Sequence, residues 1–113
     1  RERLGEDGMA ARVVLCGHSH RPGMMQVPGG PLVVNPGALG LPGFRVSREP
    51  AHQQEAGTPH ARYAMLHLAG AVPQVELLAI AYDWDRAARR AEEHGFNPAW
   101  PHIIRTGLLP DSA

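Results

Sequence analysis

Two short apolar runs, each closed by a turn signal, lie in the first third of the chain. The run "RVVLC" (12–16) stops at Gly17, and the run "PLVVN" (31–35) stops at Pro36-Gly37. Both runs are rich in β-branched residues, and both are too short for a helix. They therefore predict two buried strands.

The second half of the chain carries longer patterns. "RYAMLHLAG" (62–70) alternates along its length and is followed, across a turn, by "QVELLAIAY" (74–82), which predicts a β-hairpin. A helix is predicted over 84–94, because Asp83 or Asp85 can cap its start and Gly95 can end it. A last short helix is predicted from Asn97-Pro98 to Gly107.

The sequence contains 11 prolines and 13 glycines. They gather in segments that we interpret as long loops: 21–31, 35–43 and 48–60. The stretch 38–61 as a whole is predicted to be loop, although a structureless connection of that length is unusual in a compact domain. Residues 1–11 could form the tail of a helix broken by two glycines. The expected class is α/β, in a single partial domain that spans residues 1–113.

Composition and charge exclude some classes of function and of partner, but they do not identify a function. The 11 basic and 11 acidic residues cancel, so nothing predicts a nucleic-acid or anionic membrane partner. Cys16 is the one cysteine, which excludes an internal disulfide, fits a cytoplasmic location and predicts an inert thiol in a buried strand. No apolar run approaches a membrane span. The first residue is Arg1 rather than methionine, so we expect a piece of a longer protein.

Candidate chemistry follows the first strand, in "VVLCGHSHRP". If the backbone stays extended, His18 and His20 point to the same side with Cα atoms roughly 6.5 to 7 Å apart, and they could converge on a metal pair. The alternative is that they are simply polar residues in a loop. Their position after an apolar strand and Gly17 favours the metal site, because α/β folds build their sites at the carboxyl ends of strands.

The second strand ends in a similar way. Pro36 cannot donate a backbone hydrogen bond, and Gly37 can adopt a positive φ, so a sharp turn follows Asn35. We expect this turn to bring the Asn35 side chain near the sheet end that carries the histidines. The alternative is a plain Asn-Pro-Gly turn.

Together, "VVLCGHSHRP" and "LVVNPGALGLPG" resemble the C-terminal half of a calcineurin-like metallophosphoesterase, and most closely the small bacterial and archaeal phosphodiesterase branch. That resemblance implies a four-layer αββα sandwich. It also implies two divalent metal ions (Mn, Fe, Zn or Ni) and hydrolysis of a phosphomonoester or phosphodiester substrate. By the same resemblance, His18 ligates one metal and His20 the other, while Gly17, Asn35 and Gly37 support the site.

The chain also departs from that family's pattern. The Asp-x-His, Gly-Asp-x-x-Asp and Gly-Asn-His-Asp/Glu motifs that would supply the other ligands and the general acid are missing, so no catalytic residue is assigned. Ala38 replaces the usual serine, and Gly43 stands where the branch often has arginine; Arg45 is the candidate substitute for that arginine. We therefore expect the chain alone to be inactive and to need the N-terminal half of the same domain or a partner chain. The alternative function is a non-catalytic phosphoesterase-fold scaffold.

Overall fold

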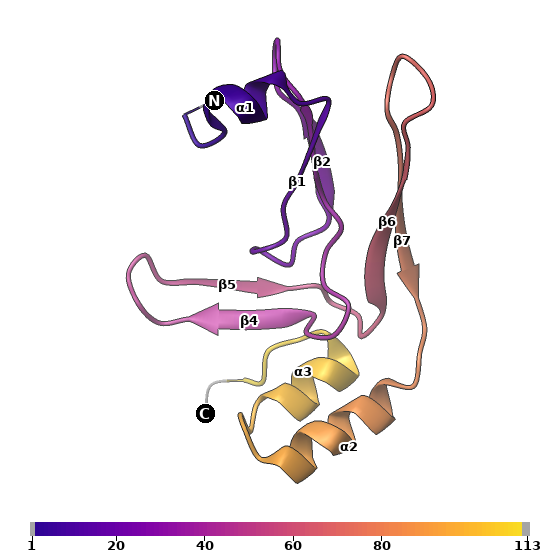
Figure 1. Cartoon of the computed structure of the whole chain (residues 1–113). Coiled ribbons are helices and arrows are strands. Elements are labelled where there is room, and N and C mark those ends of the chain that lie inside the picture. The colour runs from indigo at the N-terminus through magenta and orange to yellow at the C-terminus, as the bar shows by residue number, and fades with distance from the viewer. Residues whose placement is uncertain (1, 112–113) are drawn as a thin grey trace.

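The computed structural model describes residues 2–111 and shows a mixed α/β arrangement, as the sequence predicted (Figure 1). Its elements follow in chain order: α1 (Gly5–Ala10), β1 (Val13–Leu15), β2 (Gly23–Gln26), β3 (Leu32–Asn35), β4 (Gly43–Val46), β5 (His52–Glu55), β6 (Ala61–His67), β7 (Gln74–Ile80), α2 (Trp84–His94) and α3 (Trp100–Thr106).

The first sheet contains both predicted apolar strands. Its order is β1-β3-β2, with β3 parallel to β1 and antiparallel to β2. In the parallel pair, Val13 lies opposite Leu32 and Leu15 opposite Val34. Strands β1 and β3 confirm that the apolar runs form strands, but only β3 has buried residues, so the prediction that β1 is buried is wrong. The short strand β2 was not predicted because its sequence, Gly-Met-Met-Gln, has no clear alternation.

Two antiparallel hairpins follow. The predicted hairpin is present as β6–β7, and the Arg12 guanidinium ties it to the start of β1 by donating to the carbonyls of Leu68 (3.1 Å) and Gly70 (2.7 Å). The stretch 38–61 is not the continuous loop that we predicted, because it contains the hairpin β4–β5. Its strands carry mostly polar side chains and depend on pairing with each other rather than on an apolar pattern.

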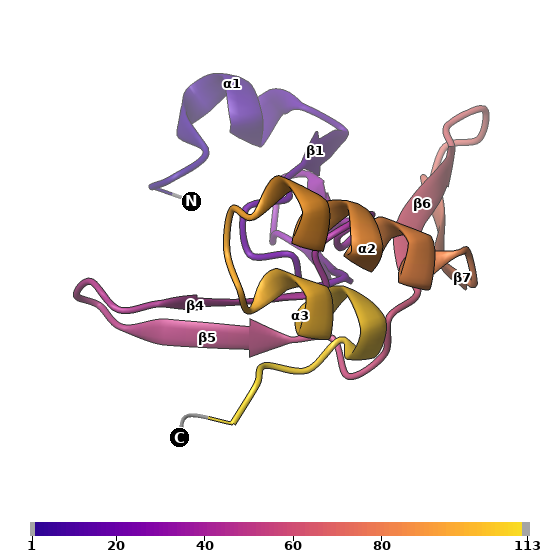
Figure 2. The same ribbon diagram turned by 90° about the horizontal axis from the view of Figure 1, so that it is seen from below.

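The helices end the chain as predicted. Asp83 caps α2 by accepting a hydrogen bond from the backbone N–H of Arg86 (3.0 Å), and Gly95 ends the helix in the left-handed conformation. Helices α2 and α3 lie side by side, with α3 next to the β4–β5 hairpin (Figure 2). At that contact, a Cβ added to Gly43 would lie 3.3 Å from the Ile103 side chain.

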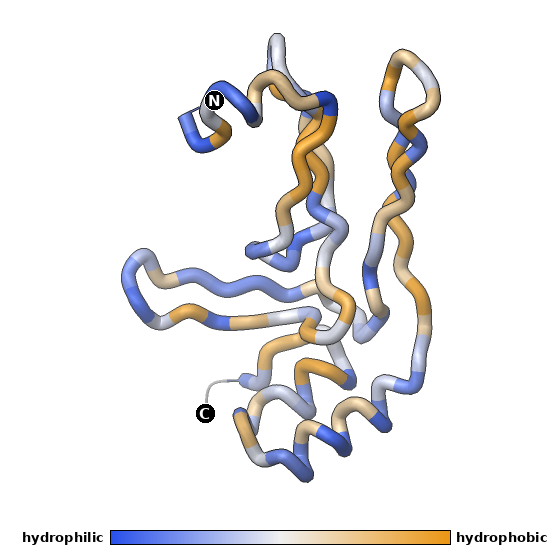
Figure 3. Tube along the Cα trace, viewed as in Figure 1, coloured by the Kyte–Doolittle hydropathy of each residue, from blue (hydrophilic) through white to orange (hydrophobic). Residues whose placement is uncertain are grey.

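The buried core is small, and much apolar surface on the strands is open. Val34 and Ala88 are completely buried, whereas Leu15 and Met25 are 63% and 65% exposed. Figure 3 shows apolar residues along the first sheet and along the β6–β7 hairpin, and helices α2 and α3 lie below both in Figure 1. Cys16 is likewise exposed, so the prediction of a buried thiol is wrong: β1 has a neighbouring strand on one side only, within the described residues.

Candidate metal centre

The carboxyl ends of β1 and β3 meet at one edge of the first sheet. The pairing continues one residue past β1, where the Cys16 N–H donates to the Val34 carbonyl at 3.0 Å. Gly17 and the histidine turn therefore leave the sheet beside Asn35, the last residue of β3. This adjacency confirms the prediction that Asn35 lies at the sheet end that carries the histidines.

The backbone between the two histidines is not extended. The His20 N–H donates to the Gly17 carbonyl at 3.0 Å, which closes a tight turn, and His20 has a φ of 57°. The same-side argument for an extended chain was therefore wrong, because β1 ends at Leu15, before the histidines begin. A left-handed φ is uncommon for a non-glycine residue, and it persists only where the surrounding structure holds the backbone in that conformation. Such residues are frequent at functional sites.

Asn35 joins the histidine turn to the Pro36-Gly37 turn. Its side chain is buried, donates through Nδ2 to Ser19 Oγ (2.9 Å) and accepts at Oδ1 from the backbone N–H of Gly37 (3.0 Å). Ser19 lies between the two histidines in the sequence, so one amide group holds both turns in register. The structure thus places Asn35 between the two turns, bonded to both.

Gly37 has the positive φ that its sequence position suggested, 89°. A Cβ at this position would lie 3.0 Å from Arg62 Cβ and 3.3 Å from Pro22 Cβ. The backbone beside it is also fixed, because the Arg62 N–H donates to the Ala38 carbonyl at 3.0 Å. A side chain at residue 37 would therefore push β6 away from the turn that follows the histidines.

The two imidazoles have different surroundings. His18 is exposed at the tip of the turn, whereas His20 is half-buried. The Nδ1 atom of His20 lies 2.9 Å from the Leu41 carbonyl oxygen. A carbonyl can only accept, so Nδ1 carries the proton, and in the neutral ring Nε2 then has the lone pair that a metal ion requires. Histidine ligands of metals commonly donate their second nitrogen to a carbonyl in this way.

The donor set is nevertheless partial. Residues 2–111 contain no group of three or more His, Cys, Asp or Glu side chains that could hold a metal ion. Two imidazoles on one turn can supply only some of the ligands of a divalent metal ion, and a dinuclear centre needs further carboxylate or imidazole donors. The described residues by themselves therefore do not form a complete metal site.

The positions that depart from the family pattern also have defined surroundings. Gly43 is buried against Ile103 and the Gln54 carbonyl, so an arginine would not fit there in this packing. In the β4–β5 register, Arg45 pairs with Gln53 and lies on the face opposite Phe44, the residue that contacts His20. Arg45 is exposed and donates to Gln53 Oε1, so its side chain does not lie beside His20.

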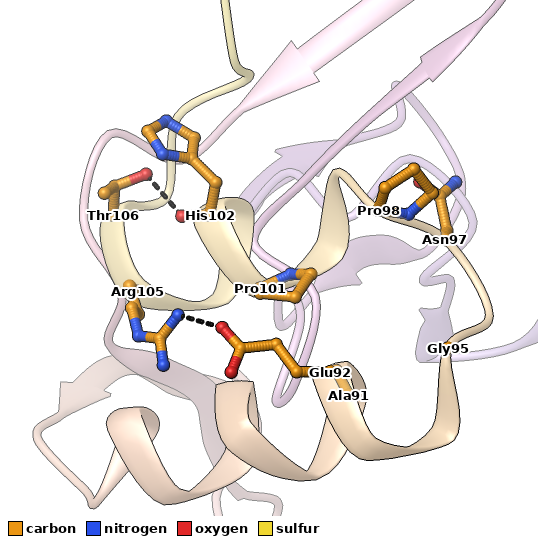
Figure 4. A pocket seen from close by; sticks show the side chains of 9 residues that line it. All are labelled: Ala91, Glu92, Gly95, Asn97, Pro98, Pro101, His102, Arg105 and Thr106. Carbon is orange, nitrogen blue, oxygen red and sulfur yellow. Dashed lines mark hydrogen bonds and ion pairs between the residues drawn. The ribbon is translucent and has the colours of Figure 1, made fainter.

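Two cavities lie near these elements. One, of about 490 Å³, opens beside the sheet end and is lined by Ser19 and Asn35 together with apolar side chains of β2 and β3. The other, of about 570 Å³, lies between α2 and α3 (Figure 4). Arg105 in this second cavity is already paired with Glu92 (2.6 Å) and Asp85 (2.8 Å), so its charge is balanced. We therefore place the candidate chemistry at the sheet end.

Comparison with known proteins identifies a family for the first half of the chain. The model of the calcineurin-like phosphoesterase superfamily domain matches residues 1–58, which include both turns at the sheet edge. The chain belongs to this superfamily. The match ends before four elements of the chain, which are β6, β7, α2 and α3. No curated protein and no solved structure matches the chain. No helix in the described part of this phosphoesterase-family chain is long and apolar enough to cross a membrane.

Sequence reasoning missed the residues that hold His20. The Leu41 carbonyl and the Phe44 ring come from a segment that was predicted to be loop, and a backbone carbonyl leaves no signal in a sequence. Phe44 offered a weak signal, as a lone aromatic residue in a stretch rich in proline and glycine.

Proposed function

We propose that this chain is the C-terminal portion of a metal-dependent phosphoesterase domain that hydrolyses phosphomonoesters or phosphodiesters. His18 and His20 each ligate one of two divalent ions, which are Mn, Fe, Zn or Ni. The observation that carries the proposal is the His20 ring: its Nδ1–H donates to the Leu41 carbonyl, at the carboxyl edge of the parallel strands and within the segment that matches the superfamily. This arrangement leaves Nε2 as a metal-binding atom.

Each residue of the site has a separate task. Bound divalent ions would act as Lewis acids and lower the pKa of a bound water. The chain's own groups prepare that site: Leu41 fixes the His20 tautomer, and Asn35 holds the Ser19 hydroxyl and the Gly37 backbone. Gly37 keeps the neighbouring turn close to β6. None of these residues is assigned a proton-transfer step.

The remaining ligands come from the N-terminal half of the same domain or from a partner chain. The uncovered surface supports this part of the proposal. Leu15, Met24 and Met25 are 63%, 55% and 65% exposed on the first sheet, and β1 is an edge strand within the described residues. Parallel strands normally have both faces covered. A covering half would add the missing layers of a four-layer αββα sandwich and bring carboxylates to the histidine turn.

The substrate is a phosphate ester, and the cytoplasm is the proposed compartment. Equal numbers of acidic and basic residues give no electrostatic reason to propose nucleic acid as a partner. The branch of small bacterial and archaeal phosphodiesterases is the proposed relationship within the superfamily.

The test is Mn²⁺-dependent hydrolysis of bis-p-nitrophenyl phosphate, measured for the chain alone and for the chain joined to a complementary N-terminal half. We expect no hydrolysis by the chain alone and measurable hydrolysis by the joined protein. His20→Ala should abolish the activity of the joined protein. His67→Ala, at an exposed histidine of β6 that pairs with Glu76, is the matched control and should retain activity.

A non-catalytic scaffold is the second candidate, and it is supported by Ala38 and Gly43, where the family more often has serine and arginine. A scaffold would retain the fold and bind a partner while hydrolysing nothing. Inactivity of the joined protein, with the metals bound, would favour the scaffold. Brisk Mn²⁺-dependent hydrolysis by the chain alone would contradict the proposal that ligands are supplied from elsewhere.

A further inference from the structure

The β4–β5 hairpin contacts His20 at two points. The Leu41 carbonyl, two residues before β4, accepts from Nδ1 at 2.9 Å. The Phe44 ring, within β4, meets the imidazole edge-on, with ring centroids 5.0 Å apart and planes at 66°. One contact fixes a nitrogen of the imidazole and the other restricts the plane of its ring.

Phe44 also contacts a second imidazole. The His52 ring of β5 packs against it with centroids 5.7 Å apart and an interplanar angle of 88°. Phe44 and His52 lie on the same face of the hairpin, because Phe44 pairs with Gln54 and Val46 pairs with His52. The phenyl ring therefore contacts both an imidazole of the hairpin and the imidazole of His20.

A hydrogen bond alone does not fix an imidazole ring. The terminal torsion of histidine is broad and roughly two-fold, so the ring can turn over, which moves Nδ1 away from the Leu41 carbonyl and puts Cδ2 in its place. Edge-to-face contact with an aromatic ring restricts that rotation. With the ring held, Nδ1 stays on the Leu41 carbonyl and the lone pair stays on Nε2.

We propose that Phe44 is a positioning residue for His20, whose ring keeps the imidazole in the Nδ1–H tautomer and so keeps Nε2 ready to bind a metal ion. The consequence for metal binding rests on the proposed function; the tautomer does not. The β4–β5 hairpin thereby becomes part of the metal site, although none of its side chains is a ligand.

The first test measures the tautomer without any metal. Long-range ¹H–¹⁵N spectra of the imidazoles are recorded on the full chain at a pH where His20 is neutral. Wild type and Phe44→Tyr, which keeps the ring, should show the Nδ1–H form of His20. Phe44→Leu should shift His20 toward the Nε2–H form that imidazoles prefer in water. Val46→Ala, a half-buried neighbour on the same face, is the matched control and should leave His20 unchanged.

An Nδ1–H spectrum in Phe44→Leu that equals the wild-type spectrum would overturn the proposal. The amide spectrum of α2 reports whether each variant is folded. If Phe44→Leu loses that spectrum, Phe44→Met, a residue of more adaptable shape that also lacks the aromatic ring, takes its place with the same expected result.

The second test uses Mn²⁺ alone as a paramagnetic probe. In wild type, substoichiometric Mn²⁺ should broaden the ring signals of His18 and His20 before those of His67. In Phe44→Leu the same broadening should need about tenfold more Mn²⁺, as is typical when an outer partner of a metal ligand is lost. Wild type without selective broadening would contradict the metal site itself. Selective broadening in wild type that Phe44→Leu reproduces at equal Mn²⁺ would contradict only the role of Phe44.

Discussion

Replacing Asn35 by alanine tests whether one buried amide holds the two turns of the site together. Asn35 is 8% exposed, and its side chain makes two hydrogen bonds, to Ser19 Oγ at 2.9 Å and from the Gly37 N–H at 3.0 Å. Alanine removes both bonds and leaves the Gly37 N–H without its acceptor.

The magnitude follows from these contacts. Each hydrogen bond contributes about 1 kcal/mol net, and an N–H left without a partner adds about 1 kcal/mol more. The free energy of unfolding of Asn35→Ala should therefore be lower by about 2–3 kcal/mol. For a chain of this size, that corresponds to a fall in Tm of about 10–15 °C.

Urea denaturation followed by circular dichroism measures this difference. Gln53→Ala is the matched control, because Gln53 is an exposed amide that accepts from exposed Arg45; its loss should cost less than about 0.5 kcal/mol. A double-mutant cycle with Ser19→Ala should give a coupling energy of about 1 kcal/mol. A cost for Asn35→Ala no larger than that of the control would refute the role assigned to Asn35.

Three further predictions concern the turn, the helix cap and acid stability. Gly37→Ala should lower the free energy of unfolding by about 1–3 kcal/mol because of its φ of 89° and its contact with β6, whereas Gly40→Ala, with open space around it, should change it little in the same urea titration. Asp83→Ala removes the cap of α2 and should cost about 1 kcal/mol, with a matching loss of helical circular dichroism on heating. The hydrogen bond from Arg105 holds the pKa of Asp85 below its ordinary value of 3.8, so the stabilisation is complete above that pH and is lost as the pH falls through the folded-state pKa. The stability difference between wild type and Asp85→Asn should therefore shrink in acid titrations below pH 3.8; a constant difference would contradict the ion pair.

Part of this fold could be predicted from the sequence because local patterns determine it. The β-branched runs gave β1 and β3, and alternation around a turn gave the β6–β7 hairpin. Asp83 and Gly95 marked the ends of α2. Each of these elements is determined by residues that lie close together in the chain.

The parts that were missed depend on distant partners. The hairpin β4–β5 pairs Phe44-Arg45 with Gln53-Gln54, residues with no common apolar pattern, so only the pairing itself makes them strands. The exposure of Cys16 depends on what covers β1, which its own sequence does not record. The prediction of an extended backbone at the histidines was wrong for a related reason. The conformation of His20 depends on a turn to Gly17 and on the Leu41 carbonyl, 21 residues away.

We propose that His18 and His20 are ligands of a two-metal centre completed from outside this chain. Anomalous diffraction at the zinc edge, from crystals of the complete domain grown with Zn²⁺, locates the bound metals. We expect two peaks, one about 2.0–2.1 Å from a ring nitrogen of His18 and one at that distance from Nε2 of His20. Peaks bound only elsewhere, with both rings uncoordinated, would contradict it.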